Sequence, residues 1–214
     1  MPARESQQTG RLRLRHLMEC TEAAAEEMAE LRPRFQQLAH EDAAPRVVSS
    51  FNLFQTPPEL AARVVGLLGT LGRTLEPSAG LGRIYHAIRQ ESPTAPVVLV
   101  EQSPECCGEL YRQTEGDEHA ELVQGDFLTL DASRLGLFDS IAMNPPFKMG
   151  ADVKHIRHAM TLLAPGGRLV SLCANGPKQR AAMQGIASEW IELPADSFKS
   201  EGTRVNAAVF VFDA

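Results

Sequence analysis

Short apolar runs alternate with stretches of helical periodicity along the chain from residue 74 onward. Runs of strand length lie at 74–76, 97–101, 121–123, 138–143, 168–173, 190–193 and 205–212. Helical patterns lie between them at 84–89, 104–114, 153–163 and 178–187. This alternation predicts an α/β fold, with a mostly parallel sheet and helices on both of its faces. No helix separates the last two strands, so we expect them to form an antiparallel pair at one edge of the sheet.

Helical patterns also precede this region. Apolar residues recur at helical intervals among charged ones over 11–40, which predicts an amphipathic arm that packs on the domain or on a second copy of the chain. Thr56 can cap a helix whose first turn contains proline, and Glu59 completes the spacing of a capping box. We therefore expect residues 41–55 to connect the arm to a helix that begins after Thr56.

The composition is that of a globular domain. The chain has 214 residues, of which 43% are hydrophobic and 22% charged. It contains no apolar run of about 18 residues and no signal peptide, so we expect no membrane segment and a cytoplasmic location. The four cysteines form no Cys-x-x-Cys pair, which predicts free thiols. The six histidines lack zinc-site spacing, so no metal is predicted.

Charge is distributed unevenly along the chain. The net charge is −6, which argues against a protein that coats nucleic acid non-specifically. Residues 148–204 nevertheless carry eight basic and five acidic residues, a net charge of +3, against −9 for the remainder. This is either ordinary surface variation or a mildly basic face that meets a polyanion. Such a face would be formed by Lys148, Lys178, Lys199 and Arg204.

A glycine-rich turn follows the first strand of the sheet, where residues 75–83 read Leu-Glu-Pro-Ser-Ala-Gly-Leu-Gly-Arg. Small residues let the backbone approach a ligand, and a helix N-terminus offers free N–H donors. Glu76 would repel the phosphates of a dinucleotide, but it suits a ligand with a cationic amino-acid end. Many tight turns look the same, so this turn alone does not establish a ligand site.

Acids also follow the next two strands. Glu101 closes its strand about 20 residues after the glycine turn, which is the position of the acid that binds a ribose diol in nucleotide-binding sheets. Asp126 follows the third strand and can accept a hydrogen bond from the exocyclic amine of an adenine ring. Phe127 can lie against the face of that ring. Taken singly, each position also fits a solvated acid or a simple Asp turn.

Asn144-Pro145-Pro146-Phe147 follows the fourth strand and is the most specific motif. Two prolines fix the backbone and remove two N–H donors, so that carbonyls point outward as acceptors. The Asn144 side-chain oxygen and the Pro145 carbonyl can then both accept from one planar NH2 group. Such bonds favour a nitrogen moving towards tetrahedral geometry, whose lone pair can attack a methyl sulfonium. Phe147 offers a flat face for stacking a planar substrate, and a purely structural loop is the alternative.

Together these motifs resemble class I S-adenosylmethionine-dependent methyltransferases, in particular the amino-methylating branch with an Asn/Asp-Pro-Pro-aromatic motif. The resemblance covers about residues 50–213, and the chain looks most like small N6-adenine methyltransferases of phages and mobile elements. It implies a Rossmann-like, seven-stranded, mostly parallel sheet with an antiparallel last strand. We expect an N-terminal helical arm and connector at 1–50 and the methyltransferase domain at 51–214.

The resemblance also implies roles for individual residues. The catalytic motif comprises Asn144, Pro145, Pro146 and Phe147. The cofactor S-adenosylmethionine would be bound by Phe54, Gln55, Thr56, Pro57, Glu76, Pro77, Ser78, Ala79, Gly80, Gly82, Glu101, Gln102, Asp126, Phe127 and Asn144. Within this set, residues 54–57 match the segment that closes over the methionine end of the cofactor.

The leading hypothesis is N6 methylation of adenine in DNA, with the base turned out of the helical stack. No separate target-recognition domain fits in the chain, so we expect the arm, the loop after Phe147 and residues 196–204 to select the substrate. Methylation of adenine in RNA, methylation of a protein glutamine, and a non-catalytic regulatory subunit that binds the cofactor are the alternatives. DNA is expected as the partner before RNA, and the arm is a candidate homodimer contact.

Overall fold

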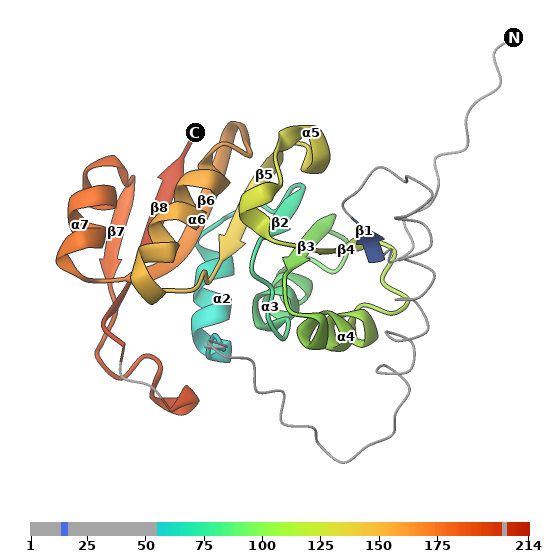
Figure 1. Cartoon of the computed structure of the whole chain (residues 1–214), viewed down its shortest axis with the longest axis horizontal. Coiled ribbons are helices and arrows are strands. Elements are labelled where there is room, and N and C mark those ends of the chain that lie inside the picture. The colour runs from blue at the N-terminus through green and yellow to red at the C-terminus, as the bar shows by residue number, and fades with distance from the viewer. Residues whose placement is uncertain (1–13, 17–54, 203–204) are drawn as a thin grey trace, which may run out of the picture.

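The computed structural model describes residues 55–202 and 205–214, together with the backbone of Leu14–His16. One sheet runs through the molecule (Figure 1). Its strands are β1 (Leu14–His16), β2 (Thr74–Glu76), β3 (Val97–Glu101), β4 (Ala120–Gln124), β5 (Phe138–Met143), β6 (Leu163–Ala174), β7 (Glu189–Glu192) and β8 (Ala207–Asp213). The strand order is β1-β4-β3-β2-β5-β6-β8-β7. β8 pairs antiparallel with both β6 and β7, and the other pairings of these described strands are parallel. The predicted α/β class and the antiparallel pair at one edge are confirmed.

Helices cover both faces of this sheet (Figure 1). The described α-helices are α2 (Pro58–Gly66), α3 (Arg83–Glu91), α4 (Pro104–Gln113), α5 (Ala132–Leu135), α6 (Ala151–Met160) and α7 (Pro177–Met183). Short 3-10 turns form η1 (Phe127–Thr129), η2 (Lys148–Gly150), η3 (Gln184–Ile186) and η4 (Lys199–Glu201). Residues of α2, α3 and α4 pack in one apolar cluster, and residues of α5, α6 and α7 pack in a second. The sheet therefore separates two cores.

The strand β3 shows why an uninterrupted apolar run forms the middle of this sheet. Val97 and Leu99 belong to the first cluster, whereas Val98 and Val100 belong to the second. Successive side chains of a strand point to opposite faces, so a strand covered on both sides needs apolar residues throughout. Each buried Val or Leu contributes about 1.5–3 kcal/mol relative to an exposed position, so both clusters stabilise the same strand.

β6 begins earlier, and α6 ends earlier, than the apolar pattern predicts. The pattern predicts a helix over 153–163 and a strand over 168–173, but α6 ends at Met160 and β6 spans Leu163–Ala174. The extra residues form an irregularity in the pairing with β5. A Cβ atom at Gly167 would lie 2.9–3.1 Å from three backbone carbonyl oxygens, so glycine is needed there. Such a bulge interrupts the alternation by which strands are recognised in sequence.

The expected helix over 11–40 is wrong at the three positions of this arm that the structure describes. Leu14–His16 form β1, which pairs in parallel with β4. The seven strands between Thr74 and Asp213 form the expected mostly parallel arrangement, and β1 adds an eighth strand at its edge. The rest of the predicted arm lies outside the described residues.

The helix expected after Thr56 is present, but its predicted cap is wrong. α2 begins at Pro58, Pro57 occupies the N-cap position, and no side chain caps the helix. The Thr56 hydroxyl instead accepts a hydrogen bond from Asn144 Nδ2 at 3.0 Å. The first helical residue is a proline without an N–H donor, so the helix start offers fewer donors to a capping side chain.

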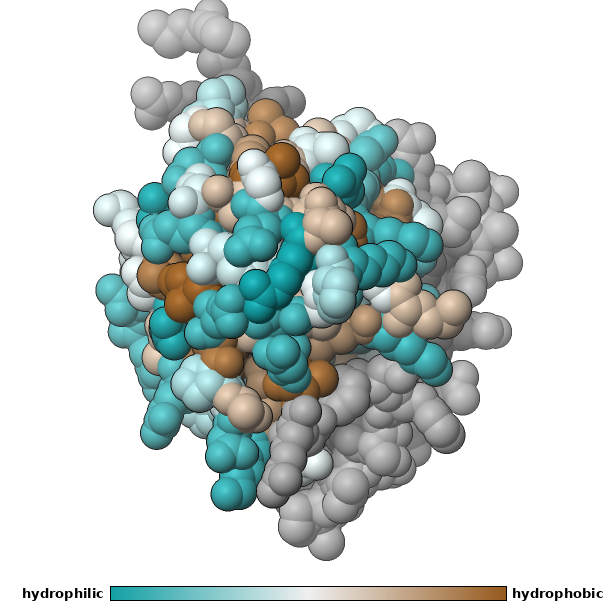
Figure 2. Space-filling model, turned by 90° about the vertical axis from the view of Figure 1, so that its left-hand side faces the viewer, coloured by the Kyte–Doolittle hydropathy of each residue, from teal (hydrophilic) through white to brown (hydrophobic). Residues whose placement is uncertain are grey.

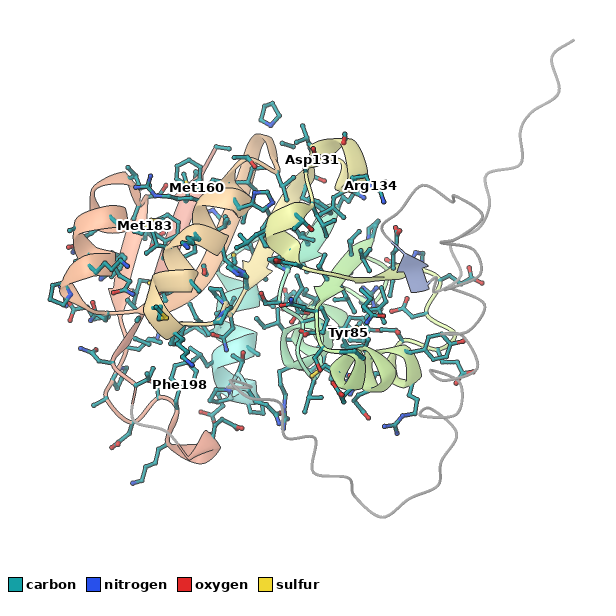
Figure 3. All side chains as sticks on the ribbon, viewed as in Figure 1. Tyr85, Asp131, Arg134, Met160, Met183 and Phe198 are labelled. Atoms are coloured by element: carbon teal, nitrogen blue, oxygen red, sulfur yellow. The ribbon has the colours of Figure 1, made fainter. Side chains whose placement is uncertain are left out.

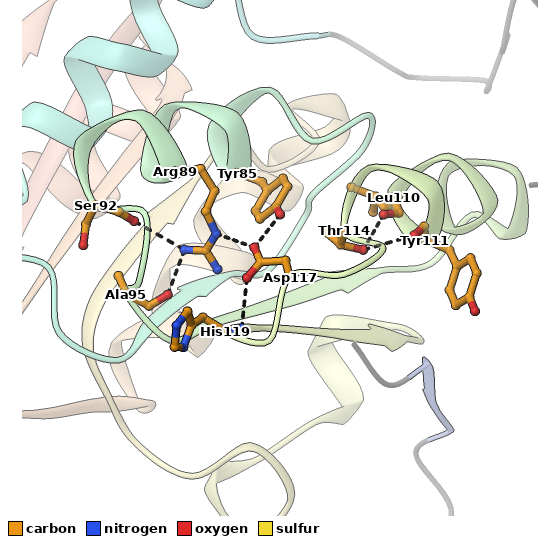
Figure 4. A network of polar contacts seen from close by, with 9 residues as sticks. All are labelled: Tyr85, Arg89, Ser92, Ala95, Leu110, Tyr111, Thr114, Asp117 and His119. Atoms are coloured by element: carbon orange, nitrogen blue, oxygen red, sulfur yellow. Dashed lines mark hydrogen bonds and ion pairs between the residues drawn. The ribbon is translucent and has the colours of Figure 1, made fainter. Parts of the chain in front are cut away.

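Asp117, in the turn between α4 and β4, holds α3 in position (Figure 4). Its Oδ2 accepts from the Tyr85 hydroxyl at 2.6 Å and from Arg89 Nε at 2.5 Å, and its Oδ1 accepts from His119 N at 2.9 Å. Burial, followed by the hydrogen bond to Asp117, raises the pKa of Tyr85 to about 12. Burial opposes ionisation of Asp117, but the hydrogen bonds from Tyr85 and Arg89 hold its pKa below the ordinary value. α3 is thereby fixed close to the glycine turn that precedes it.

The face that carries α7 and β7 is mostly hydrophilic, with small apolar areas separated by polar ones (Figure 2). None of the helices in the described ranges is long and apolar enough to cross a membrane. Cys106, Cys107 and Cys173 are buried free thiols, as the cysteine spacing predicts, and Cys20 lies outside the described residues. Burial raises the pKa of Cys173 to about 12, which keeps this thiol protonated.

Candidate active site

A cavity of about 370 Å3 lies where the carboxyl ends of β2, β3, β4 and β5 meet. These strands are adjacent and parallel, so the loops that leave them gather at one edge of the sheet. The chain continues from β2 to α3 on one face and from β5 to α6 on the other. Ligands of open α/β sheets bind at such a point, where connections depart in opposite directions.

The turn after β2 forms one wall of this cavity. Its lining residues include Glu76, Pro77, Ser78, Ala79 and Gly80. The Ala79 N–H donates to the Val100 carbonyl at 3.0 Å, and the Gly80 N–H donates to Glu101 Oε2 at 2.8 Å. Gly80 has a φ of 54°, a left-handed conformation that glycine adopts without a Cβ clash. β3 therefore holds the glycine turn against the cavity.

Glu76 is a buried acid that forms no ion pair within the described part of the chain. Its side chain is 1% exposed, and Oε2 has no hydrogen-bond partner in the described part of the chain. Burial raises the pKa of Glu76 well above its ordinary value; a hydrogen bond from the Tyr85 backbone opposes this shift, and the charge of Glu101 adds to it. A buried polar atom without a partner costs free energy, and a cationic ligand group would offset that cost.

Glu101 closes β3 with both carboxylate oxygens fixed by backbone donors. Oε2 accepts from Gly80 N, and Oε1 accepts from Ser103 N at 2.7 Å. A carboxylate oxygen has a second lone pair, so the same group can accept further hydrogen bonds from a diol. Gln102 and Ser103 line the cavity beside it. The carboxylate is thus held in one orientation next to the glycine turn.

Asp126 and Phe127 line the cavity at the end of β4. Asp126 Oδ1 accepts from Leu128 N at 3.0 Å and caps η1. Phe127 is only 2% exposed, and its ring packs edge-on against His158 with centroids 4.8 Å apart. Phe127 therefore offers little ring surface to a ligand, and the second apolar cluster holds most of its side chain.

Asn144 is positioned by a residue far away in the sequence. Its Nδ2 donates to the Thr56 hydroxyl at 3.0 Å, and both residues line the cavity. Thr56 is 4% exposed, so this contact lies out of bulk solvent. With the NH2 end of the amide turned to Thr56, the oxygen end points in a different direction. The sequence motif predicts Asn144 as an acceptor, but it gives no sign of the partner that orients it.

The rest of the motif completes this wall. Pro145, Pro146 and Phe147 line the cavity, and Pro145 is buried. The Phe147 ring lies edge-on to the Phe198 ring, with centroids 6.3 Å apart and an interplanar angle of 85°. Phe198 lies in the segment between β7 and η4, below the sheet in the view of Figure 3. This contact leaves the orientation of the Phe147 ring defined by a buried neighbour.

Of the predicted cofactor residues that the structure describes, Gly82 and Pro57 do not line the cavity. Gly82 is the N-cap of α3, with a φ of 78°, and a Cβ there would lie 2.5 Å from Gln113 Oε1 of α4. This glycine permits helix packing rather than ligand approach. Pro57 does not line the cavity and belongs to the start of α2. Phe54 lies outside the described residues. All the other predicted cofactor residues line the cavity.

Five lining residues lie outside the set predicted from the sequence, namely Leu81, Arg83, Ser103, Gly125 and His155. Arg83 lines the cavity, and its Nε donates to Gln55 Oε1 at 2.8 Å. It directly follows the glycine turn, and it is the only Lys or Arg among the described residues that line the cavity. His155 of α6 lines the opposite side, where burial lowers its pKa and so favours the neutral ring. His155 follows Pro146 by nine positions, and no motif in the sequence marks it as a site residue.

Solved structures with this fold define a class of protein. The chain is similar to TrmN from Thermus thermophilus, with 21% identity, a TM-score of 0.60 and 86% of this chain covered, although it spans only 53% of that protein. An RNA methyltransferase from Salinibacter ruber in complex with S-adenosyl-L-homocysteine is 19% identical, with a TM-score of 0.54 and coverage of 74% and 92% of the two chains. The 1,6-didemethyltoxoflavin-N1-methyltransferase of Burkholderia thailandensis is 17% identical, with a TM-score of 0.54 and coverage of 92% of each chain. The fold is that of S-adenosylmethionine-dependent methyltransferases.

The family is established by sequence. The model of the methyltransferase small domain matches residues 64–193, and the chain belongs to this family. Comparison with curated proteins gave no match. The protein is thus a class I methyltransferase whose cofactor is S-adenosylmethionine. The matched segment lies within the methyltransferase domain expected at 51–214, and the boundary at residue 50 stays a prediction.

The cavity suits this cofactor in its donors and acceptors. The buried Glu76, whose Oε2 has no partner in the described part of the chain, fits a cationic amino-acid end. Arg83, the one Lys or Arg of the described lining, fits a carboxylate, and Glu101 fits a diol. S-adenosylmethionine, when bound, supplies an electrophilic methyl group on a sulfonium. Across the described residues, no group of three or more His, Cys, Asp or Glu side chains could hold a metal ion.

Proposed function

We propose that the protein transfers a methyl group from S-adenosylmethionine to an exocyclic amino nitrogen, namely N6 of adenine in DNA. The observation that carries this proposal is the contact between Asn144 and Thr56 in the wall of the cofactor cavity. It directs the donor end of the Asn144 amide away from a substrate amine. The side-chain oxygen of Asn144 then suits a substrate NH2 group, because the two hydrogens of that group need hydrogen-bond acceptors.

The acceptors determine which nucleophile the site favours. The Asn144 side-chain oxygen and the Pro145 carbonyl belong to one rigid turn, because two prolines fix its backbone. Two hydrogen bonds from one NH2 group hold the nitrogen in place and draw its lone pair out of conjugation with the ring. An amine needs no prior deprotonation to attack a methyl sulfonium, so positioning is the main contribution of the protein.

A planar acceptor fits next to Phe147. Its ring lies in the cavity wall, and the edge-on contact with the buried Phe198 restricts its rotation. A purine stacked on this ring would present its exocyclic amine to the turn at 144–147. Duplex DNA hides that amine in the base stack, so the base must leave the helix to reach the cavity.

Transfer of a tritiated methyl group to a panel of duplex DNA, RNA and protein tests the proposal. We expect label in DNA, recovered as N6-methyldeoxyadenosine after digestion. Label recovered only in RNA as N6-methyladenosine, or only in protein, would overturn the DNA assignment while leaving the amino chemistry in place. Label in none of them, despite measured cofactor binding, would indicate a regulatory subunit.

The variant Asn144→Ala separates the chemical step from cofactor binding. We expect it to abolish measurable turnover while S-adenosylhomocysteine binds within about threefold of wild type, because the amide acts on the acceptor. Asn206→Ala is the matched control, since Asn206 is exposed and does not line the cavity. Turnover by Asn144→Ala at the wild-type rate would remove Asn144 from the mechanism.

A further inference from the structure

The loop directly after Phe147 exposes an apolar side chain beside the active site. Met149 is 88% exposed, the highest value among the large hydrophobic residues of the described chain that lie on the surface. It lies in η2, between the end of the catalytic motif and the start of α6. An isolated apolar side chain on a surface is common, so exposure alone does not indicate a function.

The backbone of Met149 supplies a second observation. Its φ is 55°, and it is the only residue other than glycine with a positive φ in the described chain. The left-handed region is unfavourable for a residue with a Cβ atom, and residues held there cluster at functional sites. A glycine or an asparagine would make this turn at lower cost. The turn alone therefore does not require a methionine.

A cation lies directly against this loop. Lys178 of α7 extends over Gly150, and its Nζ lies 3.4 Å from the Met149 carbonyl oxygen. Lys148 precedes Met149 and is exposed, as is Lys178. Two exposed lysines therefore belong to, or contact, the loop that carries the exposed thioether and directly follows Phe147. Duplex DNA is a polyanion with an interior of stacked, apolar bases. The lysines suit its phosphates, and the exposed Met149 suits its base stack.

We propose that Met149 is a wedge that enters the base stack of duplex DNA when the target base moves into the cavity, while Lys148 and Lys178 contact the flanking phosphates. This inference rests on the proposed function, because it identifies how a base reaches Phe147. Turning a base out of a duplex leaves a gap and costs stacking free energy. Methionine is unbranched and adaptable, and proteins insert such apolar side chains between base steps.

The test compares one DNA in two states. Genomic duplex DNA and the same DNA after heat denaturation serve as substrates for wild type, Met149→Gly and Met149→Leu. For Met149→Gly we expect kcat/KM to fall about tenfold or more on the duplex and to stay within about twofold on single strands, where no base has to leave a helix. Met149→Leu retains an apolar side chain and should stay within about threefold of wild type on both.

The controls separate a wedge from a structural residue. Glycine relieves the strained φ, so Met149→Gly should melt no lower than wild type. Leu137→Ala removes another exposed side chain, at the opposite end of β5. It should leave kcat/KM unchanged on both duplex and single-stranded DNA. An equal loss on duplex and single strands, or no loss on the duplex, would overturn the wedge. Wild-type enzyme that labels neither form of DNA refutes the proposed function itself, before any variant is compared.

Discussion

At the scale of single residues, Thr56 helps to orient the Asn144 amide. Its hydroxyl is the acceptor for Asn144 Nδ2. Thr56→Val keeps the shape of the side chain but removes this acceptor, which weakens the preference of the amide for one orientation. We expect kcat to fall about tenfold, because misplaced reacting groups lose alignment, with cofactor affinity unchanged. Thr56→Ser should restore the rate; an unchanged kcat in Thr56→Val would show that other contacts fix the amide.

If Glu76 binds the cofactor as proposed, both stability and cofactor binding should depend on pH through its carboxyl group. The folded, cofactor-free protein holds the Glu76 proton more tightly than the unfolded chain does, because burial raises its pKa above the ordinary value. The unfolded chain ionises first as pH rises above about 4.5, so Glu76 makes the free protein less stable on the alkaline side. Glu76→Gln should therefore flatten the fall in Tm of the free protein between about pH 5 and pH 8.

The same variant should have the opposite effect on binding. An ammonium group favours the ionised form of Glu76, so Glu76→Gln should weaken S-adenosylhomocysteine binding about tenfold or more at pH 8, measured by calorimetry. Glu59→Gln, at an exposed position of α2, is the control. Equal affinity in Glu76→Gln and wild type would place the cationic end of the cofactor elsewhere.

Arg83 offers a test of where the cofactor carboxylate lies. It is the single cation in the lining that the structure describes, and Gln55 holds its Nε. We expect Arg83→Met to weaken S-adenosylhomocysteine binding about tenfold, because a charge-assisted hydrogen bond is lost. Binding of 5′-methylthioadenosine, which lacks the amino-acid end, should not change. An equal loss for both ligands would assign Arg83 a structural role.

At the scale of elements, α3 depends on the polar network around Asp117. Asp117→Asn replaces the acceptor of Tyr85 and Arg89 by a neutral group, in a region where the side chains of Arg89 and Asp117 are each 15% exposed. We expect a loss of about 2 kcal/mol and a Tm lower by about 4–8 °C. The pKa of Asp117 is lowered in the fold, so its stabilisation is present above about pH 3.8 and disappears as pH falls further. Urea unfolding at pH 7 and pH 3 measures both effects.

The sequence pattern predicted regular elements well and long-range contacts poorly. Strands such as Val97–Glu101 follow from apolar runs, because a strand covered on both faces needs them. The bulge around Gly167 did not follow, because it breaks the alternation by which a strand is recognised. The strand at Leu14–His16 did not follow either, because it lies within a segment whose apolar residues recur at helical intervals. At the site, acids at strand ends were found from spacing. Thr56 was assigned to a helix cap because its contact with Asn144 bridges 88 positions.

At the scale of the whole molecule, the neighbours show that the fold alone does not select the acceptor. Solved structures with a TM-score of 0.54 to this chain include an RNA methyltransferase and a 1,6-didemethyltoxoflavin-N1-methyltransferase. A fold hosts many activities, so the acceptor is determined by residues around the cavity mouth. In the proposed function those residues are Phe147, whose ring contacts the buried Phe198, and the loop that follows residues 144–147.

Charge at this mouth gives a prediction for the molecule as a whole. The net charge of −6 disfavours general binding to DNA, so any affinity must come from a local surface. Lys148 and Lys178 are exposed beside the loop that follows Phe147, whereas Lys154 is exposed further along α6.

If Lys148 and Lys178 contact phosphates, each contact releases counterions when DNA binds. Replacing both with glutamine should weaken DNA binding at low salt and reduce the slope of log K against log salt concentration by about 1–2. Lys154→Gln is the control, because it also removes a positive charge but at a position away from the loop that follows Phe147. It should alter the slope much less. Fluorescence anisotropy over a range of salt concentrations, with a labelled duplex, measures both quantities, and an identical slope in all three proteins would return Lys148 and Lys178 to ordinary solvated surface.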